Sequence, residues 1–290
     1  EKIKVCGVDP AKNIAKKAVK RGVPTITEFF DKKIENILIS KKKFPKIITG
    51  TNVFAHIHDI EGSLKVIKNI LKPDGVLIIE APYLKNLIAG LEYDTIYHEH
   101  LMYLSINPMI KLFKKFEFEI FDIQFKNIHG GSIRVFVKHK NGPFKISSKI
   151  NKISNSEIKE KLDSIKTLSK FSKKVVSHRK ELRNLLKKLK SNGKRIACVG
   201  APAKGMTLLN YNKLNNDIIE FVTEVSKLKL NKYCPGTDLK IVDDNKLIEN
   251  HIDYALILPW NFKSEIMKNL KEFKKSGGRF IIPLPKIQIV

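Results

Sequence analysis

The sequence is short of cysteine, and it has no long apolar segment. Its 290 residues include three widely separated cysteines, Cys6, Cys198 and Cys234. An odd number of cysteines without metal-ligand spacing indicates neither a disulfide framework nor a zinc site, so we predict no metal site. Apolar residues make up 42% of the chain, but they never run uninterrupted for the roughly eighteen positions that a membrane span requires. We therefore expect a protein of the reducing cytoplasm with no membrane partner.

Arginine is also scarce, although the chain is strongly basic. The formal net charge is +26, yet only six of the 55 basic residues are arginines. Base readout and tight phosphate binding both favour the planar guanidinium group. Lys, Asn and Ile are abundant together, as an AT-rich coding sequence would produce, so we attribute the charge to composition and expect no nucleic acid as a partner. The alternative is a basic nucleic-acid-binding protein, whose affinity would fall steeply with salt.

Short β-branched runs alternate with helical segments in the first part of the chain, which is typical of a parallel α/β sheet. The predicted strands are 3–8, 46–49 and 76–80, and the predicted helices are 11–20, 28–39 and 60–71. Two later runs, 118–125 and 133–138, have no helix between them and predict an antiparallel hairpin at the sheet edge. The expected fold is an open α/β sheet with a reversed edge.

From Ser154 onward, apolar residues recur at three- and four-residue steps among lysines, which predicts a long amphipathic helix with at most one break. Ser154 and Glu157 have the spacing of a capping box at its start, and Gly193 is placed to end it. Further strands and helices are expected at 195–199, 206–211, 219–222, 245–249, 254–258, 262–274 and 279–282. We therefore expect a first domain at 1–145, a helical connector at 146–193 and a smaller α/β domain at 194–290.

Polar residues follow the first two predicted strands. Asp9 comes directly after the first, where an acidic side chain can accept hydrogen bonds from both ribose hydroxyls of a nucleoside. Alternatively, Asp9 is an N-cap and Pro10 the first helical residue, and both roles can coexist because a carboxylate has two oxygens. After the second strand, Gly50 lets a ligand approach the backbone. Asn52 and His56 either line a pocket there or satisfy local backbone groups.

The densest group of ionisable side chains is Asp94-Thr95-Ile96-Tyr97-His98-Glu99-His100. Tyr97, Glu99 and His100 have the chemistry of an acid, an orienting group and a base in proton transfer. The competing interpretation is a polar loop that caps the next helix. We favour the proton-transfer interpretation because so many titratable groups in seven residues are uncommon in a structural turn.

Two glycine-containing turns are further candidates for binding. In His129-Gly130-Gly131-Ser132 the glycines permit close backbone approach, and Arg134 can hold a carboxylate or phosphate; a hairpin bulge with an exposed arginine is the alternative. The turn Gly200-Ala201-Pro202-Ala203-Lys204-Gly205 joins a strand to a helix, so its amides and Lys204 would attract an anion. Its spacing is neither that of a Walker loop nor that of the usual dinucleotide fingerprint.

Taken together, these segments resemble the sugar C-methyltransferases that act on nucleotide-linked 4-keto-deoxyhexoses. The resemblance is carried by Glu80-Ala81-Pro82-Tyr83, Tyr97-His98-Glu99-His100-Leu101 with Tyr103 and Ser105, His129-Gly130-Gly131-Ser132, Gly200-Ala201-Pro202-Ala203-Lys204-Gly205 with Leu208-Leu209-Asn210-Tyr211, Pro235-Gly236-Thr237, Trp260-Asn261-Phe262 with Glu265-Ile266, and Gly277-Gly278-Arg279-Phe280 with Pro283-Leu284-Pro285. Family members carry a cysteine-rich zinc-binding segment and a first strand with an acidic, glycine-rich turn. Neither precedes Glu1, so the chain is expected to begin at the second strand of the methyltransferase sheet.

The resemblance implies a class I methyltransferase-like open sheet, a helical connector and a second, Rossmann-like domain. It implies S-adenosyl-L-methionine (SAM) as the cofactor and a nucleotide-linked keto-sugar as the substrate. The implied cofactor-binding residues are Asp9, Asn52 and His56, and the implied catalytic residues are Tyr97, His98, Glu99 and His100. The implied substrate-binding residues are Tyr83, His129, Arg134, Lys204, Asn210 and Asn261.

In the implied reaction, His100 removes a proton next to the ketone, Tyr97 or His98 donates a hydrogen bond to the enolate oxygen, and Glu99 orients the base. Two other functions stay open from the sequence. An O-methyltransferase acting on a sugar or another small molecule would keep the fold and need no carbon acid. A non-catalytic nucleotide-binding protein would carry out no methyl transfer.

Overall fold

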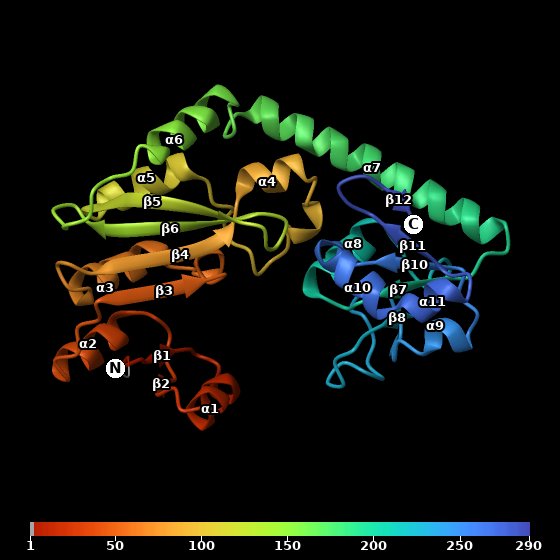
Figure 1. The fold of residues 1–290 in the computed structure, drawn as a ribbon, viewed down its shortest axis with the longest axis horizontal. Coiled ribbons are helices and arrows are strands. Elements are labelled where there is room, and N and C mark those ends of the chain that lie inside the picture. Colours follow the sequence, from red (N-terminus) through yellow and green to blue (C-terminus); the bar gives the residue numbers. More distant parts are fainter. Residues whose placement is uncertain (1–2) are drawn as a thin grey trace. The chain divides into compact units, whose positions relative to one another are not determined.

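The computed structural model describes residues 3–290, which form two compact units (Figure 1). Glu1 and Lys2, where the predicted first domain begins, lie outside the described residues. Unit 1 comprises the chain up to Pro82, Leu101–Lys126 and Ser132–Ile158. Unit 2 comprises Tyr83–His100, Asn127–Gly131 and Lys159–Val290. The division at 145 and 193 stays a prediction, and the units differ from it because two short early segments pack with the C-terminal part.

Unit 1 contains a four-stranded sheet in the order β3-β4-β6-β5. Its strands are β3 (Ile47–Thr51), β4 (Val76–Pro82), β5 (Phe118–Lys126) and β6 (Ser132–His139). β3 and β4 are parallel, whereas β6 is antiparallel to both β4 and β5. The prediction of a reversed hairpin at the sheet edge is therefore confirmed. Leu77 and Ile79 of β4 are buried, as expected for an apolar strand inside a sheet.

The predicted first strand is much shorter than expected. β1 (Gly7–Val8) pairs in parallel with β2 (Thr25–Ile26), and these two strands form a sheet of their own. Ile3 and Val5 are exposed, so the prediction of a strand over 3–8 is confirmed only at its end. β2 was not predicted, because two residues are too few to show a periodicity.

The helices of unit 1 are α1 (Lys12–Lys20), α2 (Lys32–Ser40), η1 (Phe54–His56), α3 (Ile60–Ile70), α5 (Ile106–Lys115) and α6 (Lys149–Lys159). The predicted capping box at the start of the long helix is wrong, because Ser154 lies inside α6. The buried Glu157 carboxylate instead accepts hydrogen bonds from the backbone N–H groups of Ile106 (2.7 Å) and Asn107 (2.9 Å). It therefore caps α5, a helix about fifty residues away in sequence.

The long amphipathic segment is broken once, as predicted. α6 ends at Lys159, and α7 (Ile165–Ser191) begins after Ser164, whose hydroxyl accepts a hydrogen bond from the Thr167 N–H at 3.2 Å. Gly193 follows the end of α7 with a φ of +73°, the left-handed conformation that favours glycine at a helix end. Although α7 has 27 residues, no helix within residues 3–290 is both long and apolar enough to cross a membrane.

Unit 2 contains a six-stranded sheet in the order β12-β11-β10-β7-β8-β9 (Figure 1). The strands are β7 (Ile196–Val199), β8 (Val222–Thr223), β9 (Ile241–Val242), β10 (Tyr254–Ile257), β11 (Arg279–Ile282) and β12 (Gln288–Ile289), of which only β12 pairs in the antiparallel sense. All four residues of β7 are buried, as expected for the centre of a parallel sheet.

Several helices of unit 2 contribute residues to the hydrophobic cluster around this sheet. The helical segments of the unit are α4 (Leu84–Ala89), η2 (Tyr93–Thr95), α7, α8 (Ala203–Tyr211), α9 (Lys246–Glu249), η3 (Trp260–Phe262), α10 (Lys263–Asn269) and α11 (Lys271–Lys275). Leu182 and Leu186 of α7 are fully buried in the same hydrophobic cluster as β7. Most of the predicted connector is thus part of the unit 2 core. α8 packs against η2, which brings the segment before Tyr97 into this unit.

Candidate functional site

Tyr97 and His100 form a hydrogen-bonded pair in unit 2. The Tyr97 hydroxyl lies 3.2 Å from His100 Nε2, and the two ring centroids are 4.3 Å apart. His100 Nδ1 lies 2.7 Å from the backbone oxygen of Thr95. Because a carbonyl oxygen only accepts hydrogen bonds, Nδ1 carries the ring proton and Nε2 is the basic nitrogen. In this tautomer the phenol can donate a hydrogen bond to Nε2.

A backbone carbonyl contacts the His100 ring, and the orienting role of Glu99 stays a prediction. The Thr95 oxygen fixes the imidazole, while Glu99 and His98 both have exposed side chains. Tyr97 and His100 are half-buried. Burial raises the pKa of Tyr97, and the negative charges of Glu99 and Asp94 raise it further. Tyr97 therefore keeps its proton at neutral pH and is available as a hydrogen-bond donor.

A buried charged cluster lies directly before this pair in the chain. The Asp94 side chain is fully buried, and its Oδ2 atom accepts a hydrogen bond from Trp260 Nε1 at 2.7 Å. Lys204 Nζ lies 3.8 Å from the same oxygen and 4.1 Å from the centroid of the Trp260 ring, and it donates to Asn261 Oδ1. Burial raises the pKa of Asp94 and lowers that of Lys204, while the attraction between the two charges opposes both shifts.

Glu92 adds a second carboxyl group to this cluster. It is buried, and its pKa is raised to about 7, first by burial and then by the charge of Asp94. A Cβ atom at Gly130 would lie 2.2 Å from Glu92 Oε1, and one at Gly131 would lie 2.1 Å from Asn86 Nδ2. Both glycines also have positive φ angles. Packing against Glu92 and Asn86 therefore explains this glycine pair without a ligand.

A second tyrosine–histidine pair lies in the interior of unit 2. His178 of α7 donates from Nε2 to the Pro283 oxygen at 2.7 Å, so its Nδ1 atom accepts from the Tyr93 hydroxyl at 3.2 Å. Asn212 Nδ2 donates to the same hydroxyl at 2.9 Å. Burial lowers the pKa of His178, which keeps this imidazole neutral.

The other predicted residues of unit 2 lie at separate places. Tyr83 is buried at the start of α4, and His129 is exposed in a turn with a φ of +52°. Asn210, at the far end of α8 from Lys204, donates to the backbone oxygens of Met206 and Pro235. Among the predicted substrate-binding residues, the structure thus brings Lys204 and Asn261 together.

In unit 1, two of the three predicted cofactor-binding residues follow strands, and these strands belong to two different sheets. Asp9 follows β1, and its Oδ1 atom accepts a hydrogen bond from the Ala11 N–H at 2.8 Å. The alternative in which Asp9 is the N-cap and Pro10 the first helical residue is wrong, because Ala11 is the N-cap of α1. Asn52 follows β3 with a φ of +53°, and within residues 3–290 its buried Oδ1 atom has no hydrogen-bond partner. His56 is exposed at the end of η1.

Arg134 is paired inside unit 1. Its Nε and Nη2 atoms donate to Glu80 Oε2 at 2.7 and 2.6 Å, across the directly paired strands β4 and β6. Glu80 is buried, so this guanidinium group already neutralises an internal carboxylate. A phosphate or carboxylate of a substrate would have to share the group with Glu80.

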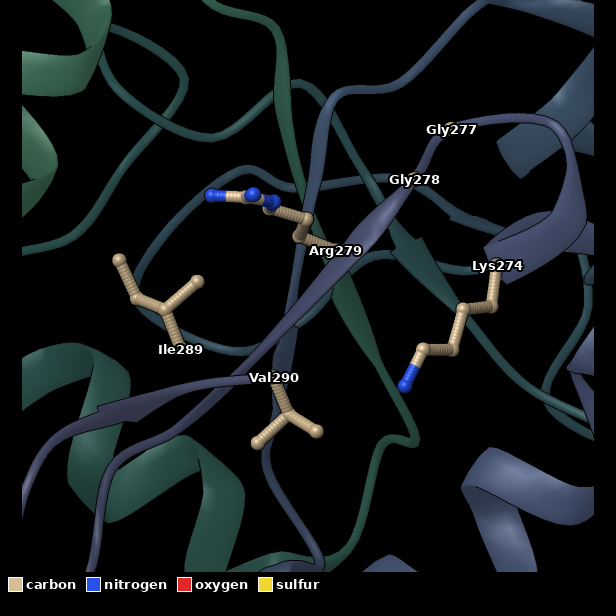
Figure 2. A pocket seen from close by; sticks show the side chains of 6 residues that line it. All are labelled: Lys274, Gly277, Gly278, Arg279, Ile289 and Val290. Carbon is tan, nitrogen blue, oxygen red and sulfur yellow. The ribbon is translucent and has the colours of Figure 1, made fainter.

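Figure 2 shows a pocket of about 550 Å³ in unit 2. It is lined by Lys274, Gly277, Gly278, Arg279, Ile289 and Val290, at the end of α11 and along β11 and β12. The predicted catalytic and substrate-binding residues are not among the lining residues. Local chemistry, and not the shape of this pocket, therefore points to the candidate site.

Sequence reasoning selected the segment from Asp94 to His100, but it gave Asp94 no role and did not consider Glu92 or the contact with Trp260. Glu92 and Asp94 are two acidic residues in a short loop, and Trp260 is the single tryptophan of the chain. The rarity of tryptophan could have drawn attention to Trp260. Its contact with Asp94 could not be predicted, because the two residues are 166 positions apart.

Both parts of the chain match methyltransferase families. Residues 1–123 match a family described as a methyltransferase domain, and residues 127–285 match the C-methyltransferase C-terminal domain family. The chain is 33% identical over 287 residues to the C-methyltransferase NovU of Streptomyces niveus, and the match covers 99% of this chain and 68% of that protein. The similarity thus extends over both units.

Solved structures of methyltransferases are more distant relatives. A SAM-dependent methyltransferase of Thermotoga maritima, described as a possible histamine N-methyltransferase, has 20% identity and a TM-score of 0.37, over 47% of this chain and 73% of that chain. An O-methyltransferase of a Brevibacillus brevis trans-AT PKS multienzyme, in complex with S-adenosyl-L-homocysteine, has 12% identity and a TM-score of 0.34, over 58% and 70% of the two chains.

Proposed function

Because the chain belongs to the C-methyltransferase family, we propose that it methylates a carbon next to the keto group of a nucleotide-linked sugar. It is a SAM-dependent methyltransferase with a class I methyltransferase-like α/β fold. The family accounts for methyl transfer to carbon. The keto-sugar substrate and the roles of individual residues are the proposed part.

Methyl transfer to carbon requires a base, because a C–H group must first lose a proton to become a nucleophile. A neighbouring keto group makes this feasible by accepting the negative charge as an enolate. The observation that supports the proposal is the His100 tautomer, with its proton on Nδ1 and its basic Nε2 beside the Tyr97 hydroxyl. A neutral imidazole next to a phenolic donor is suited to removing this proton and stabilising the resulting oxyanion.

In the proposed reaction, His100 Nε2 takes the proton from the carbon next to the ketone, and the C–H electron pair moves into the enolate. Tyr97 donates a hydrogen bond to the enolate oxygen. The cofactor, when bound, would supply an electrophilic methyl group on its sulfonium sulfur, and transfer of this methyl group to the enolate carbon would break the S–C bond and leave S-adenosylhomocysteine. The Thr95 carbonyl then stabilises the protonated imidazole through Nδ1.

Two side chains of unit 1 fit a nucleoside ligand. Asn52 Oδ1 is buried and lacks a hydrogen-bond partner in the described part of the chain, which is costly unless a ligand supplies a donor. The Asp9 carboxylate lies at the end of β1 and uses Oδ1 for the Ala11 N–H. We propose that Asn52 and the second oxygen of Asp9 accept hydrogen bonds from the cofactor, with His56 as a further contact.

The proposed function is tested by following the acidic C–H group itself. The full-length protein is incubated in deuterated water with nucleotide-linked 4-keto-deoxysugars and S-adenosylhomocysteine, and deuterium incorporation at each sugar carbon is measured by NMR. We expect exchange at one carbon next to the ketone, and a loss of about 100-fold or more with His100→Gln.

His251→Gln, which changes an exposed histidine of unit 2, is the matched control and is expected to exchange normally. Undiminished exchange with His100→Gln would remove His100 from the role of base. Methyl transfer from SAM to a sugar oxygen, seen by NMR of the product, would overturn the proposal of a carbon acid.

A further inference from the structure

We propose that Asp94 is a positioning residue for the pair Tyr97 and His100, and that Trp260 and Lys204 hold Asp94 in place. The inference rests on the proposed function in that His100 is the base. Lys204 and Trp260, in the C-terminal half of the chain, would then support catalysis without contacting the reacting carbon.

Asp94 is held by groups that reach it from distant parts of the chain. Trp260 donates to its Oδ2 atom, and Lys204 lies 3.8 Å from that oxygen while facing the indole ring. A fully buried carboxylate is destabilising unless it is neutralised, so loss of these contacts would leave the Asp94 charge uncompensated in the interior. These contacts therefore fix the position of the η2 segment that carries Asp94.

The preceding residue of η2 is fixed in the same way. The Tyr93 hydroxyl donates to His178 and accepts from Asn212, and both partners are buried. Two successive residues of one 3₁₀ turn are thus anchored by side-chain contacts to α7, α8 and η3. Because the turn is so short, these anchors leave little freedom to its backbone dihedral angles.

The next residue transmits this order to His100. Thr95 is the last residue of η2, and its backbone oxygen accepts the Nδ1–H hydrogen bond of His100. If η2 rotated, this oxygen would turn away and the imidazole could place its proton on Nε2. The basic nitrogen would then be Nδ1, which does not face Tyr97. The anchoring of Asp94 therefore selects the His100 tautomer that can act as a base.

The same geometry assigns Lys204 an internal role. Its ammonium group donates to Asn261, lies beside Asp94 and stacks on Trp260. A substrate diphosphate that captured Lys204 would leave the Asp94 carboxylate buried without its counter-charge. We therefore expect Lys204→Gln to lower kcat and not to raise the KM for the sugar nucleotide, as loss of a diphosphate contact would.

The test uses NMR of the full-length protein labelled with [¹⁵N]histidine. The ring signals of His100 are identified by their loss in His100→Gln, and their ¹⁵N shifts report the tautomer. We expect the Nδ1–H form in the unmodified protein and a substantial Nε2–H population in Asp94→Asn and in Trp260→Phe. The kcat of methyl transfer is expected to fall about 10- to 100-fold in both variants, with KM nearly unchanged.

Asp253→Asn is the matched control. Its carboxylate also belongs to unit 2 and binds Lys194 Nζ (3.0 Å) and the Arg195 N–H (2.8 Å), but it has no part in the candidate site. We expect this variant to leave the His100 signals unchanged. Because Trp260 is the only tryptophan, its fluorescence shows directly whether Asp94→Asn has released the indole N–H.

The outcomes separate the inference from the proposed function on which it rests. If the fluorescence of Asp94→Asn changes while the His100 nitrogen shifts do not, Asp94 is a structural residue and the inference is wrong. If the tautomer changes but kcat does not, positioning is confirmed and the role of His100 as the base fails. Trp260→Phe keeps the test decisive if Asp94→Asn does not fold, because it removes the hydrogen bond and retains an aromatic ring.

Discussion

Unit 2 contains the same chain of groups twice, once in its core and once near its surface. In each case a tyrosine hydroxyl lies within hydrogen-bond distance of one histidine nitrogen, and the other nitrogen of that ring donates to a backbone carbonyl. In the core pair, Asn212 completes the hydrogen bonds of Tyr93, and His178 is buried. In the other pair, Tyr97 and His100 are half-buried and lie next to exposed ionisable residues.

The two pairs contain the same chemical groups and differ in burial and in neighbouring residues. These surroundings therefore distinguish a structural histidine from a reactive one. The Tyr93 hydroxyl and both His178 nitrogens have hydrogen-bond partners in the interior, so a rearrangement would leave a buried polar atom unsatisfied. A half-buried pair can exchange a partner for a substrate at little cost. Substitutions in the two pairs test this difference.

Replacing each tyrosine by phenylalanine should separate the two pairs. We expect Tyr97→Phe to reduce kcat by about 100-fold, because it removes the donor to the developing oxyanion, with little change in stability. Tyr93→Phe should instead lower the free energy of unfolding by about 1–2 kcal/mol, because His178 Nδ1 loses its buried donor and Asn212 Nδ2 loses one of its two acceptors. Steady-state kinetics and urea denaturation measure the two effects, and equal losses of kcat in both variants would contradict the comparison.

Glu92 should make the surroundings of the reactive pair sensitive to pH. Its pKa is about 7 in the folded protein and about 4.3 when unfolded, so the folded state binds more protons between these values. Stability therefore falls as pH rises from about 4.5 to 7, by at most about 3 kcal/mol. Glu92→Gln is expected to remove this slope in thermal unfolding scans, whereas Glu249→Gln, at an exposed position, should retain it.

His178 should produce the opposite dependence on pH. Burial lowers its pKa, so the unfolded state binds the extra proton and stability is lost as pH falls below about 6.5. We expect His178→Gln to be less stable by about 2 kcal/mol at pH 8, and to lose less further stability on acidification to pH 5. Denaturation at the two pH values measures this, and an undiminished loss would show that other groups cause it.

Asn52 represents a third condition, because its buried Oδ1 atom has no hydrogen-bond partner within residues 3–290. Asn52→Gly suits the positive φ angle and removes the unsatisfied oxygen, so we expect unchanged or slightly higher stability. The affinity for S-adenosylhomocysteine should fall about tenfold, which is the loss of one hydrogen bond. Asn231→Gly, at another left-handed position but exposed, is the control for calorimetric titration. Lost stability with unchanged affinity would show that Asn52 serves the fold.

Local patterns predicted the elements of the fold better than their contacts. The hairpin of β5 and β6, the central strand β7 and the stop at Gly193 follow from runs of apolar residues and from glycine conformation. The capping box failed because Ser154 and Glu157 fit the local pattern while Glu157 in fact caps α5. Spacing along the chain cannot show that a distant helix end needs a carboxylate.

The sequence alone determined the class of protein, the alternation of strands and helices, and the segment that carries Tyr97 and His100. These depend on neighbouring residues, whose periodicity and chemistry can be read along the chain. Only the tertiary structure decided that Thr95 orients His100, that Arg134 pairs with Glu80, and that Lys204 and Trp260 enclose Asp94. Burial and pairing of charges depend on which distant segments meet, and this is settled only when the core is packed.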